Sequence, residues 1–254
     1  MHPAICCVPV SPLRAEPSHK AEMVSELLFG ESCAIVDQSA DHWIKLKCKY
    51  DGYEGWCQEN HLIETDQAMY DIEKGLTRKW ITEIEYNGQP MQVPLGSSLP
   101  PMKKGSVLWK DNLVVYGGKI WNPREARKDK KSIRRLAYSF LNTPYLWGGK
   151  TVFGTDCSGY TQTVFRFLNI PLFRDAWQQA MQGTLVDSLE SALFGDLAFF
   201  DNAEGKITHV GILLSNHKII HASGKVREDK IDSEGIVSLE TLQRTHHLQF
   251  IRRF

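Results

Sequence analysis

T-D-C-S-G-Y, residues 155–160, places one cysteine between a glycine- and aromatic-rich approach, Y-L-W-G-G at residues 145–149, and an apolar pattern of helical period. Cys157 is therefore expected at the start of a helix. The unpaired N–H groups and the positive dipole end there favour a thiolate over a thiol. An isolated cysteine is more often a buried structural thiol, but the flanking glycines and polar neighbours favour a nucleophile.

Two histidines follow at positions that suit a general base. T-H-V-G-I at residues 208–212 and I-I-H-A-S at residues 219–223 each place a histidine beside a short β-branched run, so His209 and His221 are predicted on adjacent antiparallel strands. A strand histidine is commonly a core residue. A cysteine, a histidine and a third group that orients the histidine nevertheless make the arrangement of acyl-transfer enzymes.

Four blocks in this order, D-C-S-G-Y, G-D-L-A-F-F, T-H-V-G-I and I-I-H-A-S, resemble the NlpC/p60 family of papain-like cysteine peptidases, which cut bacterial cell-wall peptides. The resemblance covers about residues 129–254. It implies that Cys157 is the nucleophile, that His209 is the general base and acid, and that His221 fixes the orientation and tautomer of His209. His217, His246 and His247 have no such context and are expected at the surface.

The resemblance also implies residues for the oxyanion and the substrate. The main-chain N–H of Cys157 and the Tyr145 hydroxyl are the expected oxyanion donors, although Tyr145 and Trp147 have an equally good alternative as core aromatics. Ala176 departs from the family pattern, which has a serine there, and this puts one substrate contact in doubt. The positions matching those that hold the γ-linked D-glutamate and its neighbours are Asp156, Ser158, Arg174 and Asp175.

The first half of the chain predicts two small barrels. Short apolar runs separated by turn signals fill residues 1–62, which resemble a bacterial SH3-like domain. Residues 63–125 are predicted as a second barrel of this kind, with a hairpin at Asn87-Gly88 and a final strand at Gly118–Trp121. Residues 126–254 form the catalytic domain. The expected fold class is α+β, a papain-like NlpC/p60 domain preceded by two SH3-like β-barrels.

The barrels suggest a way to select the substrate. Members with this architecture act on free muropeptides, and a barrel residue pairs with the terminal ammonium of the peptide. Such a pair rejects a blocked terminus, because the protein carboxylate would be left unpaired. Glu16 and Tyr53 are the candidates for this amine gate, with a solvent-facing glutamate and a core tyrosine as equally good alternatives.

Composition limits the partners. Thirty basic and thirty acidic residues leave a net charge of +0, which favours neither a nucleic-acid nor a membrane partner. The start of the chain lacks the pattern of a secretory signal, so we expect a cytoplasmic protein, or a periplasmic one if a leader was removed. The six cysteines are expected to be mostly free thiols, no metal-ligand spacing is present, and thiolate chemistry implies no cofactor. The oligomeric state stays open.

The resemblance predicts an endopeptidase that cleaves the γ-D-glutamyl–L-diamino acid bond of peptidoglycan-derived peptides with a free L-Ala terminus, in murein recycling. The diamino acid, meso-diaminopimelate or lysine, is not determined. In one alternative the Cys157 thiol is still the nucleophile but acts on a different bond. The protein would then be an N-acetylmuramoyl-L-alanine amidase or an acyltransferase of the same superfamily. The other is an inactive adaptor that binds wall peptides.

Overall fold

The computed structural model describes residues 2–254. The chain divides into two compact units. The first unit comprises the described chain up to Glu125 together with Trp147–Thr151, and the second comprises Ala126–Leu146 and Val152–Phe254. Among the helices of residues 2–254, none combines the length and the apolar character needed to cross a membrane.

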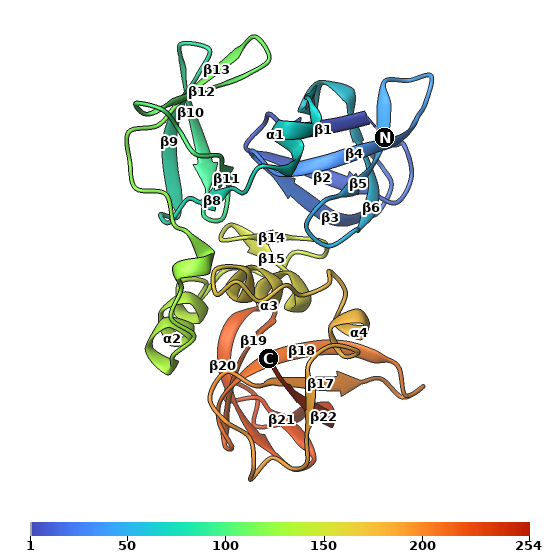
Figure 1. Ribbon diagram of the computed structural model, residues 1–254. Coiled ribbons are helices and arrows are strands. Elements are labelled where there is room, and N and C mark those ends of the chain that lie inside the picture. The colour runs from blue at the N-terminus through green and yellow to red at the C-terminus, as the bar shows by residue number, and fades with distance from the viewer. Residues whose placement is uncertain (1) are drawn as a thin grey trace. The chain divides into compact units, whose positions relative to one another are not determined.

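The first barrel is a single antiparallel sheet of seven strands in the order β3-β2-β6-β5-β4-β1-β7 (Figure 1). Its inward-facing side chains alternate along the strands and form one apolar core that includes Leu13, Leu27 and Leu46. The strands are β1 (His2–Cys6), β2 (Val10–Arg14), β3 (Met23–Leu28), β4 (Ser32–Gln38), β5 (Trp43–Cys48), β6 (Glu54–Gln58) and β7 (Leu62–Glu64).

Cysteines contribute to this core as small apolar residues. Cys6, Cys33, Cys48 and Cys57 all belong to the core cluster, and all six cysteines of the chain are free thiols, which confirms the expectation from sequence. Burial raises the pKa of the Cys57 thiol to about 12. These thiols are therefore protonated and unreactive at neutral pH.

The second barrel-like part contains a four-stranded sheet in the order β10-β9-β13-β12. Asn87 and Gly88 both have positive φ angles, 51° and 77°, which fit the predicted hairpin turn. Phe29 of the first barrel packs on Trp109, with ring centroids 4.9 Å apart, inside a core shared by the two parts. The strands are β8 (Gly75–Leu76), β9 (Ile81–Tyr86), β10 (Gln89–Pro94), β11 (Ser98–Leu99), β12 (Ser106–Trp109) and β13 (Asn112–Val115).

The prediction of a strand at Gly118–Trp121 is wrong. Only Trp121 pairs, through an isolated bridge to Leu76. Two consecutive glycines, Gly117 and Gly118, supply no side chains for packing on a pleated surface, which disfavours a strand. Three short helices complete this unit: η1 (Glu59–His61), α1 (Gln67–Asp71) and η2 (Pro123–Glu125).

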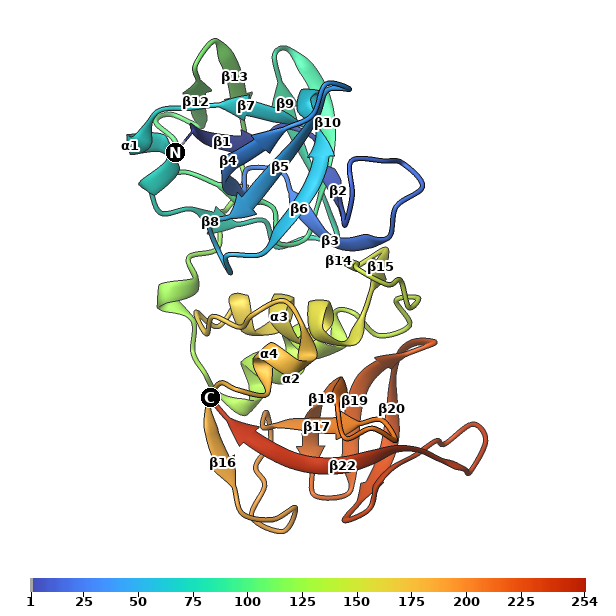
Figure 2. The ribbon, with the colours of Figure 1, turned by 90° about the vertical axis from the view of Figure 1, so that its right-hand side faces the viewer.

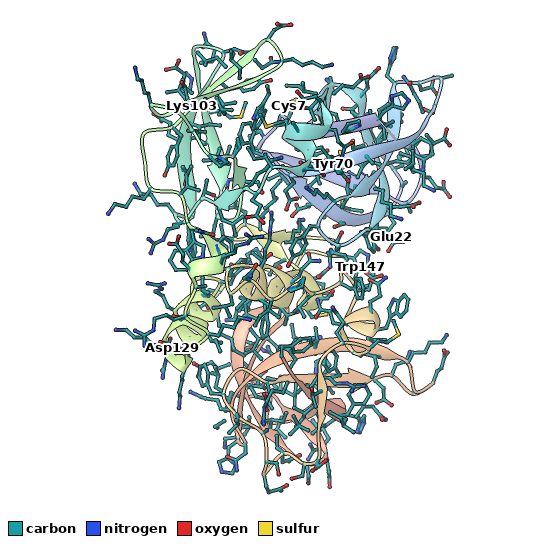
Figure 3. All side chains as sticks on the ribbon, in the orientation of Figure 1. Cys7, Glu22, Tyr70, Lys103, Asp129 and Trp147 are labelled. Carbon is teal, nitrogen blue, oxygen red and sulfur yellow. The ribbon has the colours of Figure 1, made fainter. Side chains whose placement is uncertain are left out.

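Residues 147–151, which include strand β14 (Lys150–Thr151), are attached to the first barrel. The Trp147 Nε1–H donates to Glu22 Oε1 at 2.6 Å, and the two residues lie side by side in Figure 3. Lys150 Nζ forms a buried ion pair with Glu31 Oε2 at 3.0 Å. Gly148 has a φ of +77°, and a Cβ there would come 2.4 Å from a main-chain oxygen, so only glycine fits this approach.

The second unit packs helices on one side of an antiparallel sheet (Figure 2). Strand β22 pairs with both β17 and β21, so six strands close into a barrel in the order β17-β18-β19-β20-β21-β22, with β16 added beside β22. The helices are α2 (Lys130–Tyr138), α3 (Cys157–Arg166) and α4 (Ala176–Gln179). The strands are β15 (Gly154–Thr155), β16 (Thr184–Val186), β17 (Leu197–Asp201), β18 (Ile207–Ser215), β19 (Lys218–Ser223), β20 (Lys225–Asp232), β21 (Gly235–Val237) and β22 (Arg244–Arg253).

The α+β class predicted for this part is confirmed, but strand β20 was not predicted. Its sequence, K-V-R-E-D-K-I-D, is mostly charged and resembles a solvated loop. The buried residues of this strand are Val226, Asp229 and Ile231. A charged residue on the inner face of the barrel therefore interrupts the apolar signal by which strands are recognised.

Candidate active site

Cys157 is the first residue of helix α3, and a side-chain cap places it there. Asp156 has an extended backbone conformation and its Oδ1 accepts a hydrogen bond from the Gly159 main-chain N–H at 2.6 Å. This bond satisfies one of the amide donors left unpaired at the helix start. The T-D-C-S-G stretch thus fixes the position of Cys157 through its own local structure.

A buried ion pair holds the cap in turn. Arg174 Nη2 lies 2.6 Å from Asp156 Oδ2, and Arg174 Nη1 lies 3.0 Å from Asp156 Oδ1 and 3.1 Å from Ser158 Oγ. The Arg174 side chain is only 1% exposed. The geometry therefore gives Arg174 a role inside the protein, supporting the start of α3, and the substrate contact implied for it stays a prediction.

The Cys157 thiol lies against strand β18, with Sγ 3.9 Å from the carbonyl oxygen of Thr208, the residue before His209. Burial raises the pKa of the Cys157 thiol to about 12, and the Asp156 charge adds to this rise, while a main-chain hydrogen bond from Val210 and the Arg174 charge oppose it. Burial thus opposes the effect of the helix start on the thiol, and the thiolate expected there stays a prediction.

The two predicted histidines are in direct contact. His209 Nε2 lies 2.8 Å from His221 Nδ1, and both rings are buried on neighbouring strands, β18 and β19. Burial lowers the pKa of His209 well below its usual value, and the charges of His221 and His246 would lower it further. Burial also lowers the pKa of His221, although its hydrogen bond to Asp229 partly offsets this. Both imidazoles are therefore neutral at rest.

Asp229 extends this chain of contacts and was missed in the sequence. Its Oδ2 lies 2.9 Å from His221 Nε2 and 2.8 Å from Arg227 Nε. The sequence K-V-R-E-D-K-I-D carries no clear signal for it, because six of its eight residues are charged and only the structure shows that Asp229 is buried with Val226 and Ile231. Recognising a buried carboxylate there requires knowing that β20 pairs with β19.

His246 is not the surface residue expected from sequence. It is half-buried on β22, and its ring stacks on that of His209 with centroids 4.1 Å apart and an interplanar angle of 27°. Burial lowers the pKa of His246 to about 4, and the His221 and Arg227 charges contribute. A neutral imidazole therefore covers one face of the His209 ring. His217 and His247 are exposed, as expected.

Tyr145 lies close to the predicted nucleophile. Its main-chain N–H donates to the Gly224 carbonyl at 2.8 Å, which places it beside the end of β19. The Tyr145 side chain is half-buried, and burial is the main reason that the pKa of its hydroxyl is raised. The charges of Cys157 and Asp156 raise this pKa further. The phenol is therefore a neutral hydrogen-bond donor, and its role toward the oxyanion stays a prediction.

Asp175 and Ala176 stand at the start of helix α4. Asp175 is half-buried, and its main-chain N–H donates to Gln178 Oε1 at 3.0 Å. Ala176 is buried as the first residue of the helix. Gln179 ties this helix to α3, because its Nε2 donates to the Ser158 carbonyl at 3.0 Å.

Three predicted residues belong to the other unit. Trp147 bonds to Glu22 there, as described above. Glu16 is exposed in the loop between β2 and β3, and Tyr53 packs against the core of the first barrel. Their roles toward a substrate stay predictions.

A thiol at a helix start, next to the strand that carries a buried, oriented imidazole, is suited to nucleophilic acyl transfer. Comparison with known proteins agrees with this chemistry. Residues 142–244 match the NlpC/P60 family, and residues 13–62 match the bacterial dipeptidyl-peptidase SH3 domain.

Relatives with both parts of the chain are known. The dipeptidyl-peptidase 6 of Lysinibacillus sphaericus is 26% identical over 263 residues, covering 91% of each protein. The gamma-D-glutamyl-L-lysine dipeptidyl-peptidase of Bacillus subtilis strain 168 is 28% identical, covering 78% of this chain and 71% of the relative. The crystal structure of an NlpC/P60 family protein from Bacillus cereus has the same fold, with a TM-score of 0.81 at 21% identity over 99% of both chains. The chain therefore carries an NlpC/P60 domain, matched over residues 142–244, with a bacterial dipeptidyl-peptidase SH3 domain ahead of it.

Proposed function

We propose that this protein is a cysteine endopeptidase that hydrolyses the γ-D-glutamyl–L-diamino acid bond of peptidoglycan-derived peptides with a free N-terminal L-Ala. The observation that carries the proposal is Cys157 at the start of α3, next to strand β18 with its buried His209–His221 pair. Three relatives that share most of the chain's length are named as dipeptidyl-peptidases, and two of them as gamma-D-glutamyl-L-lysine dipeptidyl-peptidases, which supports the choice of bond.

In this mechanism the resting pair is a neutral thiol and a neutral imidazole. His209 takes the Cys157 proton as Sγ attacks the γ-carbonyl carbon of D-glutamate. The negative charge on the tetrahedral intermediate is stabilised by the Cys157 main-chain N–H and the Tyr145 hydroxyl. Protonated His209 then donates its proton to the departing amine of the diamino acid.

The second half of the reaction releases the dipeptide. A water molecule gives a proton to His209 and attacks the thioester carbon, and collapse of this intermediate breaks the C–S bond. The thiolate takes the proton back from His209. Both neutral groups are restored, which agrees with their burial in the resting site.

The requirement for a free terminal amine is part of this proposal, with Glu16 and Tyr53 as candidate partners of the ammonium group. Both residues lie within the segment that matches the dipeptidyl-peptidase SH3 domain. A free amine is present on peptides already released from the wall, so we place the reaction in cytoplasmic recycling of such peptides.

Mass spectrometry of cleavage products tests the proposal. L-Ala-γ-D-Glu-meso-diaminopimelate and L-Ala-γ-D-Glu-L-Lys are each offered with a free or an acetylated alanine. Release of L-Ala-D-Glu from the free peptides alone is the expected result, and comparison of the two rates identifies the diamino acid. Equal cleavage of the acetylated peptides would reject the amine gate, and no cleavage of any peptide would reject the endopeptidase.

Two controls define the chemistry. Cys157→Ala should abolish turnover, whereas Cys57→Ala, a buried thiol of the first barrel, should leave it unchanged apart from effects on stability. An N-acetylmuramoyl peptide is the substrate for the alternative bond. Release of its sugar with no L-Ala-D-Glu formed would identify an amidase instead.

A further inference from the structure

Asp229 is a buried carboxylate surrounded by donors. It is 0% exposed, and its Oδ2 faces His221 Nε2 at 2.9 Å and Arg227 Nε at 2.8 Å. Its Oδ1 accepts from the Leu239 main-chain N–H at 2.7 Å. Burial alone would raise the pKa of Asp229, but the hydrogen bonds from His221 and Leu239 and the Arg227 charge bring it below its usual value. The side chain is therefore ionised and can only accept hydrogen bonds.

An acceptor at this position determines where the protons lie on both imidazoles. Because the Asp229 carboxylate cannot donate, the 2.9 Å contact requires a proton on His221 Nε2. A neutral His221 then has an unprotonated Nδ1. That nitrogen faces His209 Nε2 at 2.8 Å, so the proton of this second hydrogen bond must lie on His209 Nε2. A neutral His209 is left with its lone pair on Nδ1.

We propose that Asp229 is a positioning residue that fixes the tautomers of both histidines, so that Nδ1 of His209 is the ring nitrogen free to accept the thiol proton. One proton moves from Cys157 Sγ to this Nδ1. His209 keeps its Nε2 proton as an imidazolium and continues to donate to His221, so neither His221 nor Asp229 changes protonation state. Neither His209 nor His221 therefore has to change its tautomer between the two halves of the reaction.

The charges around the chain support this assignment. Arg227 on β20 pairs with Asp229 and also with Glu240, whose Oε2 lies 3.0 Å from Arg227 Nη1. His246 on β22 stacks on His209 and is neutral above about pH 4. Arg227 thus provides the positive charge that keeps Asp229 ionised while the histidines beside it stay neutral.

Asp229→Asn tests the proposal because an amide cannot reproduce the acceptor pair. If the amide oxygen faces Leu239 N–H, the amide NH₂ faces His221 and becomes a donor there, which reverses both tautomers. If the amide oxygen faces His221, the amide NH₂ faces the Leu239 main-chain N–H. Two donors then meet, and the buried hydrogen bond from Leu239 is lost. The expected result is a loss in kcat of about 100-fold to 10,000-fold with little change in KM, as for other partners that orient a catalytic histidine.

The direct measurement is ¹⁵N NMR of histidine-labelled protein at pH 7.5, with ring signals assigned by His209→Gln and His221→Gln variants. The wild-type protein should show His209 protonated on Nε2 and bare on Nδ1. In Asp229→Asn the Nδ1 tautomer should become populated on His209. Asp232→Asn is the matched control, because Asp232 lies on the same strand and pairs with Arg244, and it should leave kcat and both tautomers unchanged.

The effect on turnover rests on the proposed function, but the tautomer measurement does not. Wild-type His209 protonated on Nδ1 would overturn the proposal whether or not the peptides are cleaved, and this result does not depend on an Asp229 variant that folds. An Asp229→Asn protein that loses kcat with unchanged tautomers would also overturn it, since Asp229 would then act only on stability. Failure of wild-type protein to cleave any wall peptide, with the expected tautomers present, would reject the function alone.

Discussion

Burial sets the chemistry of the individual side chains in this site. Cys157, His209 and His221 are each at least nine-tenths buried, and burial moves the pKa of the thiol up and of the imidazoles down. Burial thus disfavours a charged pair at rest. In the proposed mechanism His209 therefore takes the thiol proton as a general base while the Cys157 main-chain N–H and the Tyr145 hydroxyl stabilise the developing negative charge.

His246 gives a prediction at this scale. His246→Phe keeps a ring stacked on His209 and should leave kcat within about twofold of the wild-type value. His246→Ala removes the stack and should lower kcat by about two- to tenfold, which is the range expected for the loss of one aromatic contact. Because His246 is neutral above about pH 4, His246→Phe should not change the pH profile of kcat between pH 6 and 8. Steady-state kinetics of both variants decides this, and equal losses would show that the stack does not position His209.

At the scale of elements, the start of α3 depends on a residue far along the chain. The local sequence supplies the cap, Asp156, but the carboxylate is buried and needs the guanidinium of Arg174 beside it. Separating a buried carboxylate from its partner is costly, since the charge remains without compensation. The helix that carries the nucleophile is therefore stabilised by the segment that leads into α4.

The prediction is that Arg174→Met lowers the free energy of unfolding by about 3–5 kcal/mol. The double variant Asp156→Asn/Arg174→Met should recover part of this loss, because asparagine still caps the helix without leaving a buried charge. Urea unfolding measures both values. Arg124→Met is the matched control, as the side chains of the Arg124–Glu73 pair are 64% and 62% exposed, so its loss should cost about 1 kcal/mol or less. Similar losses for Arg174→Met and the control would contradict the argument.

At the scale of the whole molecule, the buried histidines link stability to pH. His209, His221 and His246 have pKa values lowered by burial, so the unfolded chain binds protons below about pH 6.5 that the folded chain does not. Their contribution to stability is complete above pH 6.5 and is lost as the pH falls; for His246 the loss occurs between about pH 6.5 and 4.

We therefore expect Tm to fall steadily from pH 7 to pH 4.5, before the carboxylates Asp229 and Asp232 begin to titrate. Differential scanning calorimetry at constant ionic strength provides the measurement. His246→Phe should give a shallower decrease because it removes one of the three groups. A Tm that is constant over this range would show that these histidines take up protons as readily in the folded protein as in the unfolded chain.

The sequence by itself determined the order of the parts and the elements on which Cys157, His209 and His221 lie. Cys157 follows an N-cap signal and begins a helix, and His209 and His221 lie within β-branched runs, so each position is set by contacts between near neighbours in the chain. Strand pairing then brings the two histidines together, as two adjacent strands joined by a tight turn must do.

Only the tertiary structure decided the groups that surround them. Asp229 lies on a charged strand whose inner face is visible only once β20 pairs with β19, and His246 reaches His209 because β22 closes the barrel. The same holds for Arg174, whose charge is buried against Asp156, and for Cys157, whose pKa burial raises. Burial and long-range pairing arise from the folded arrangement of distant segments, so no local pattern encodes them.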